Sequence, residues 1–145
     1  MDIEIKNLQR TIRINPAPLR RSLVKTLRHE GVRKAALSIV FVSDPQIRSL
    51  NRKHLKKNTA TDVLAFDFRE APRKKKPRII NGEIIISVET AKTNSRIHRT
   101  TLSREIELYA IHGVLHLLGY DDHRASDIVR MRRKEKELLD YLAYP

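Results

Sequence analysis

The chain has 145 residues, of which 40% are hydrophobic and 32% are charged, and it contains no cysteine. This composition is typical of one globular domain with its own hydrophobic core, and it excludes a disulfide framework, a thiolate metal site and a disordered chain. Thirty Lys and Arg against seventeen Asp and Glu give a formal net charge of +13, which favours a polyanion such as nucleic acid as partner over a merely solvated basic surface. No apolar run approaches the roughly 20 residues of a membrane span, and residues 1–13 lack the apolar core of a signal peptide, so we expect a cytoplasmic protein.

The first half of the chain predicts a strand, a helix, a second strand and a second helix. Apolar and charged residues alternate at the start, and two prolines followed by a leucine stripe predict a helix that ends at Gly31. A segment rich in β-branched residues comes next, and Ser43-Asp44-Pro45 predicts the N-terminus of another helix. The four predicted elements cover residues 3–5, 16–31, 37–42 and about 43–54.

The second half predicts two more strands and three more helices. Prolines and a run of basic residues between the two strands indicate an exposed loop at residues 69–78. The predicted strands are residues 62–68 and 82–88, and the predicted helices are about 89–98, 102–118 and 125–142. We therefore predict an α+β (α/β) fold with one four-stranded mixed sheet packed against about five helices, in a single domain over residues 1–145.

Three of the six histidines lie within one short segment. His112 and His116 are four residues apart on a predicted helix, so their rings share one face, and Gly119 then breaks the helix so that His123 can return to the same point. The helix is apolar nearly all round and is therefore expected to be buried, where two imidazoles need partners. The alternative is two core histidines bonded to backbone or water. We expect one zinc ion per chain, held by His112, His116 and His123.

Three protein ligands with an open fourth position are typical of a catalytic zinc. A zinc peptidase would ordinarily place Glu directly after the first His as its general base, and Gly113 occupies that position here. The peptidase hypothesis is therefore disfavoured. Glu105 lies two turns before His112 and either orients its ring or, as we favour, is an exposed acid in the first turn of the helix.

The segment His112-Gly-x-Leu-His-Leu-x-Gly-Tyr-Asp resembles the signature of the YbeY family, metal-dependent bacterial endoribonucleases. Leu50-Asn51, residues 61–66 (Thr-Asp-Val-Leu-Ala-Phe) and residues 82–87 (Gly-Glu-Ile-Ile-Ile-Ser) are similar to further blocks of that family, in the same order. The resemblance covers roughly residues 35–125. It implies a zinc-like ion on the three histidines, single-stranded RNA as substrate, and a role with the small ribosomal subunit in ribosomal RNA maturation and ribosome quality control.

The sequence departs from the YbeY pattern at three positions. The family separates its second and third ligands by five residues, a register that Asp122 rather than His123 satisfies here, so Asp122 is the alternative third ligand. Leu55 occupies the position of a family Arg that is thought to serve catalysis. Glu83 replaces the family's Asp.

The lost Arg at Leu55 leaves two alternatives. Either Arg52, Lys56 or Lys57 supplies the positive charge against the phosphate, or that contribution is absent; we name His112, Lys56 and Arg52 as the catalytic residues. We expect a longer set of basic residues to follow the RNA backbone. The alternative is that these residues only form a solvated charged face. These residues are Arg52, Lys53, Lys56, Lys57, Arg73, Lys74, Lys75 and Lys76.

The sequence therefore predicts a metal-dependent endoribonuclease that acts on ribosomal RNA. The main alternative is an RNA-binding or ribosome-binding assembly factor in which the metal only braces the fold. The missing Arg favours that alternative.

Overall fold

The computed structural model describes residues 1–55, 61–70 and 77–143. The four strands of the described chain are β1 (Asp2–Asn7), β2 (Lys34–Val42), β3 (Val63–Asp67) and β4 (Ile79–Ser87). The five helices are α1 (Pro16–His29), α2 (Asp44–Leu55), α3 (Val88–Ile97), α4 (Leu102–Leu117) and α5 (Ala125–Ala143).

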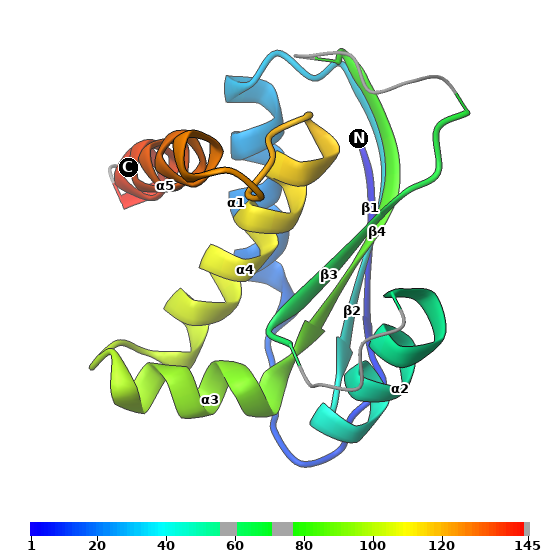
Figure 1. The fold of residues 1–145 in the computed structure, drawn as a ribbon, viewed down its shortest axis with the longest axis vertical. Helices are drawn as coiled ribbons and strands as arrows, with labels where there is room; N and C mark the ends of the chain where they lie inside the picture. The colour runs from blue at the N-terminus through cyan, green and yellow to red at the C-terminus, as the bar shows by residue number, and fades with distance from the viewer. Residues whose placement is uncertain (56–60, 71–76, 144–145) are drawn as a thin grey trace.

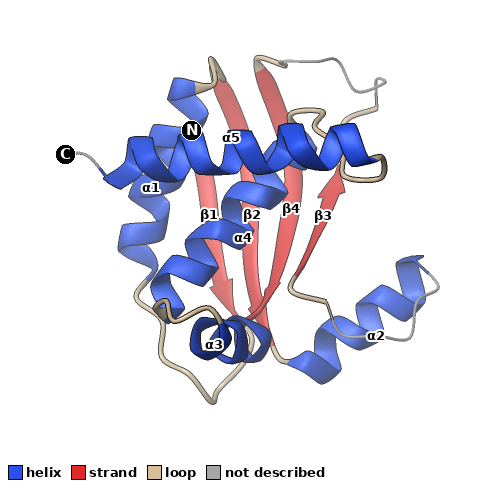
Figure 2. Ribbon diagram, turned by 60° about the vertical axis from the view of Figure 1, so that its left-hand side comes forward, coloured by secondary structure: helices blue, strands red, loops and turns tan. Residues whose placement is uncertain are grey.

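The strands form one mixed sheet in the order β1-β2-β4-β3. Strands β1, β2 and β4 run parallel, and the short edge strand β3 is antiparallel to β4 (Figure 2). The predicted α+β fold, with four strands in a mixed sheet and five helices, is confirmed. Strands β2 and β4 each begin three residues before the predicted start, because the parallel ladder between them extends through residues that alternate between exposed and buried.

Helices cover the two faces of the sheet unequally. Helices α1, α4 and α5 lie on one side of the sheet and α2 lies on the other (Figure 1). The larger core joins α1, α3, α4 and α5 to the inner face of the sheet, whereas α2 contributes Ile47 and Leu50 to a small cluster on the opposite face. Among the described residues, none of the helices combines the length and apolarity that crossing a membrane requires.

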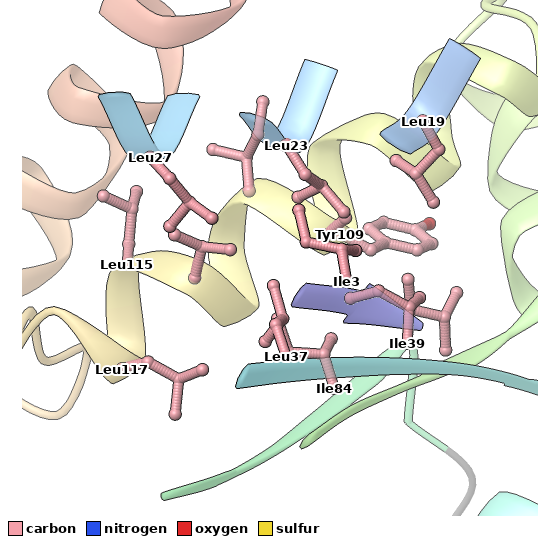
Figure 3. Close-up of a cluster of buried hydrophobic side chains, with 14 of the residues drawn as sticks. Ile3, Leu19, Leu23, Leu27, Leu37, Ile39, Ile84, Tyr109, Leu115 and Leu117 are labelled. Carbon is pink, nitrogen blue, oxygen red and sulfur yellow. The ribbon is translucent and has the colours of Figure 1, made fainter. Parts of the chain in front are cut away.

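Helix α4 is the centre of the larger core. In Figure 3, Leu115 and Tyr109 of α4 lie between the leucines of α1 and the side chains of the sheet. Leu115 is fully buried and Tyr109 is 4% exposed. A helix enclosed on several sides cannot turn about its axis without losing these contacts, so the directions of its remaining side chains are fixed.

Gly113 allows α4 to approach β4 closely. A Cβ atom at this position would lie 2.7 Å from Cγ2 of Ile84, nearer than side-chain carbons approach without displacement. The residue that follows His112 therefore faces the sheet. A Glu here would be directed into the core, which gives a structural reason for the absence of the peptidase pattern.

Candidate metal centre

The metal candidates lie on the last two turns of α4 and on the turn that follows. Helix α4 begins with Thr101 as N-cap, whose Oγ1 accepts a hydrogen bond from the backbone N–H of Arg104 at 3.1 Å. It ends where Gly119 takes a positive φ of 98°, and the N–H of Tyr120 donates back to the carbonyl of Leu115 at 3.0 Å. This left-handed turn reverses the chain and returns the following residues toward the histidines.

Three ligand atoms converge at this end of α4. Nε2 of His112 and Nε2 of His116 are 3.0 Å apart, and Oδ2 of Asp122 lies 3.5 Å from each of them. Zinc–nitrogen bonds of about 2.0–2.1 Å in a tetrahedral site place neighbouring ligand atoms roughly 3.3 Å apart. The three atoms therefore have the spacing and the chemistry to hold one divalent ion, and their side chains are 21–38% exposed, which leaves the site open to solvent.

The two candidates for the third ligand lie in different places. Asp122 belongs to the cluster with His112 and His116. His123 is 84% exposed, and its Nε2 lies 3.3 Å from Oδ1 of Asp121. The structure thus brings together the alternative ligand rather than the favoured one, and which of the two holds an ion stays a prediction.

Glu135 of α5 is a site residue that the sequence interpretation missed. Its Oε1 lies 2.8 Å from Nδ1 of His112, and its side chain is 15% exposed. The signal for it was present, because Glu135 falls at helical spacing between Met131 and Leu138 on the buried stripe of α5. Sequence alone could not indicate which residue this carboxylate faces.

The predicted role of Glu105 as an exposed acid in the first turn is wrong. Glu105 is 2% exposed, accepts a hydrogen bond from Thr100 Oγ1 at 2.6 Å, and lies 3.2 Å from His98 Nδ1. Burial by itself raises the pKa of the Glu105 carboxyl, but the hydrogen bonds from Thr100 and His98 outweigh burial and lower it. Glu105 therefore holds the loop before α4 and does not orient His112.

Acidic neighbours set the electrostatics at His112. Burial by itself lowers the pKa of the His112 imidazole. Its hydrogen bond to Glu135 and the negative charges of Glu135, Asp122 and Asp62 outweigh burial and raise the pKa above the ordinary value. The same negative charges favour a bound cation.

A second contact missed from the sequence fixes the C-terminal turn of α4. Arg69 forms a two-pronged pair with Asp67, with Nε 2.9 Å from Oδ1 and Nη2 2.6 Å from Oδ2. The same Nη2 donates to the carbonyl of Leu117 at 2.8 Å. Since Leu117 directly follows His116, the end of β3 holds the backbone beside a candidate ligand.

Of the predicted RNA-contacting residues, only Arg52 and Lys53 lie in the described part of the chain. Both are exposed on the last turns of α2, and Leu55, at the position of the family Arg, is 51% exposed. The other predicted basic residues are Lys56, Lys57, Arg73, Lys74, Lys75 and Lys76, and they lie outside the described residues.

Comparison with known proteins agrees with the sequence motifs. The family model for "Endoribonuclease YbeY" matches residues 4–143. A protein named Endoribonuclease YbeY from Syntrophus aciditrophicus is 33% identical over 100% of this chain and 92% of its own length. Another of that name from Pelotomaculum thermopropionicum is 36% identical over 98% of this chain and 97% of its own.

The chain belongs to the YbeY endoribonuclease family. The resemblance inferred from the sequence motifs is therefore confirmed. A solution structure of a protein from Thermotoga maritima shares the fold, with a TM-score of 0.67 and 23% identity over 97% of this chain and 88% of that one. The YbeY-like blocks are far apart in sequence but adjacent in space, since β3 pairs with β4 and both contact α4.

Proposed function

We propose that this chain is a metal-dependent endoribonuclease that cleaves single-stranded RNA, in one domain spanning residues 1–145. The observation that carries the proposal is the convergence of His112, His116 and Asp122, with ligand atoms 3.0–3.5 Å apart, in a member of the YbeY family. By family membership we further propose that it acts in the cytoplasm, on RNA of the small ribosomal subunit, in ribosomal RNA maturation and ribosome quality control.

The proposed ligands are His112 and His116 together with Asp122, and His123 is kept as the alternative to Asp122. Two imidazole nitrogens and one carboxylate oxygen suit zinc, and the same donor set also suits other divalent first-row ions. When bound, such an ion supplies positive charge that polarises a phosphodiester or acidifies a water molecule. The ligand side chains are partly exposed, so an RNA phosphate has access to them.

The chain's own basic residues have the task of binding and orienting the RNA. Arg52 and Lys53 are exposed at the end of α2, and the segment that directly follows this helix continues to Asp62, which lies near enough to His112 to raise its pKa. Asp62 therefore lies close to the candidate metal centre. We propose that Arg52, with Lys56, supplies cationic contacts to phosphate, because phosphate contacts position a nucleic acid without reading its sequence.

Cleavage of a labelled single-stranded RNA tests the proposal. The metal-loaded wild type should cut the RNA, and both a chelator and His112→Ala should abolish cutting together with the bound metal. His29→Ala is the control, because His29 belongs to a second possible metal-binding group, with Glu30 and Glu137, apart from the cluster of His112. This variant should cut the RNA as the wild type does. Equal cutting by wild type and His112→Ala would contradict the proposal.

The second candidate function is an RNA-binding assembly factor with a structural metal. The observation that favours it is Leu55 at the position of the family Arg. In that case the metal-loaded wild type binds RNA without cutting it, and His112→Ala lowers the free energy of unfolding while leaving the RNA intact. Measuring cleavage and unfolding on the same samples separates the two functions.

A further inference from the structure

Glu135 occupies an unusual position on α5. The buried stripe of this helix contains Met131, which is 1% exposed, and Leu138, which is fully buried. Glu135 lies four residues after Met131 and three before Leu138, so it is on the same face of the helix. Its side chain is 15% exposed. A carboxylate with so little exposure to water is unfavourable unless a hydrogen-bonded or charged partner compensates for the lost hydration.

Its partner is the ring nitrogen of His112 that faces away from the ligand cluster. Oε1 of Glu135 lies 2.8 Å from Nδ1 of His112, while Nε2 of the same ring lies 3.0 Å from His116 and 3.5 Å from Asp122. An ionised carboxylate accepts hydrogen bonds and donates none, so it selects the tautomer of His112 with the hydrogen on Nδ1. The lone pair of Nε2 then points at the cluster, as a metal ligand requires.

We propose that Glu135 is a positioning residue of the metal centre: it sets the tautomer and orientation of His112 and thereby couples the packing of α5 to metal binding. The proposal rests on the proposed metal site. Metal-binding histidines commonly donate their second ring nitrogen to a carboxylate, and losing that acceptor weakens metal binding by about 10–100-fold. Here the acceptor comes from another helix, 23 residues further along the chain. Metal affinity should therefore report on whether α5 is packed against α4.

Metal affinity of three variants tests the proposal. Competition with a chromophoric chelator gives the dissociation constants for Zn²⁺ and Co²⁺ of the full chain. We expect Glu135→Ala to bind each ion about 10–100-fold more weakly. Glu135→Gln should lose less metal affinity, since its amide oxygen can still accept the hydrogen bond from the Nδ1–H group of His112. Asp140→Asn is the matched control, because this carboxylate is on the same helix, is 55% exposed and belongs to none of the possible metal-binding groups of the described residues. The metal affinity of this variant should equal that of the wild type.

A second readout separates positioning from a purely structural role. Nitrogen-15 NMR of the metal-free protein, under alkaline conditions in which imidazoles are neutral, reports the tautomer of His112. The wild type and Glu135→Gln should carry the proton on Nδ1, and Glu135→Ala should shift it toward Nε2. If the carboxylate only stabilised the fold, its removal would lower the unfolding temperatures of the metal-free and the metal-bound protein equally. The tautomer of His112 and the metal affinity would then be unchanged.

Each outcome decides the proposal. Unchanged metal affinity in Glu135→Ala, or an Nε2–H tautomer in the wild type, would overturn it. If Glu135→Ala does not fold, the comparison of Glu135→Gln with Asp140→Asn and the wild-type tautomer still decide. A wild type that binds metal with the expected dependence on Glu135 but does not cut RNA would refute the proposed function and leave this inference standing.

Discussion

The metal centre at the end of α4 and the basic end of α2 carry the two parts of the proposed chemistry, and they are built in opposite ways. His112 and His116 extend from a helix packed between α1, α5 and the sheet, and contacts from α5 and β3 hold its last turns. Arg52 and Lys53 extend into solvent from a helix that buries only Ile47 and Asn51. Metal ligands must be positioned to within tenths of an ångström, which requires a rigid support. Electrostatic attraction of a polyanion acts over several ångströms and needs no such support.

The largest expected effect separates the two candidate third ligands. Asp122→Ala should weaken Zn²⁺ binding by more than about 100-fold, or roughly 2.7 kcal/mol, because removing a ligand costs more than removing its outer support. His123→Ala should bind Zn²⁺ as the wild type does, since His123 is directed to Asp121. Metal content after dialysis, measured by mass spectrometry, checks both variants. Loss of the ion from His123→Ala alone would make His123 the ligand.

The next largest effect tests how firmly β3 holds α4. Arg69→Ala breaks the pair with Asp67 and the hydrogen bond to Leu117, and we expect the free energy of unfolding in urea to fall by about 2 kcal/mol. This is less than the roughly 3–5 kcal/mol for a fully buried pair, because these side chains are 16% and 12% exposed.

The control for Arg69→Ala is a variant that breaks an exposed ion pair on the surface of α5. Lys136 and Asp140 are 78% and 55% exposed, so Lys136→Ala should change the same free energy much less than Arg69→Ala does. Equal effects of the two variants would show that the end of β3 does not brace the helix.

A smaller effect tests the close approach of α4 to the sheet. Gly113→Ala places a methyl group 2.7 Å from Cγ2 of Ile84, at a cost of about 1–3 kcal/mol for overpacking. Alanine's higher helix propensity returns about 1 kcal/mol, so we expect a net loss near 1 kcal/mol in chemical denaturation. The same substitution in an Ile84→Val background should cost less, because the Cδ1 atom 2.9 Å away is then gone.

The sequence was sufficient for the fold because its patterns were local and periodic. The leucine stripe of α1 and the alternation in β1 predicted their elements, and the apolar residues of α4 predicted that this helix is buried. The expectation that burial extends to its two histidines is only partly met, since His112 and His116 are 23% and 21% exposed. Glu135 and Arg69 were missed because their partners, His112 and Leu117, are 23 and 48 residues away, and only the packing of α5 and β3 on α4 brings them together. The choice between Asp122 and His123 depended on one turn at Gly119, where a single residue of register decides which side chain faces the site.

The smallest effect concerns α2. Arg52→Gln should leave the free energy of unfolding within about 0.5 kcal/mol of the wild type, because the side chain is exposed. RNA binding should weaken a few-fold, and the slope of log affinity against log salt should fall by about 0.7, as for one lost contact to single-stranded phosphate. Filter binding over a salt series measures both quantities. Cleavage at saturating RNA should be nearly unchanged, because an attractive charge acts on encounter more than on the bound state. A large loss of cleavage at saturation would instead place Arg52 at the scissile phosphate, and α2 would then need to be held as firmly as α4.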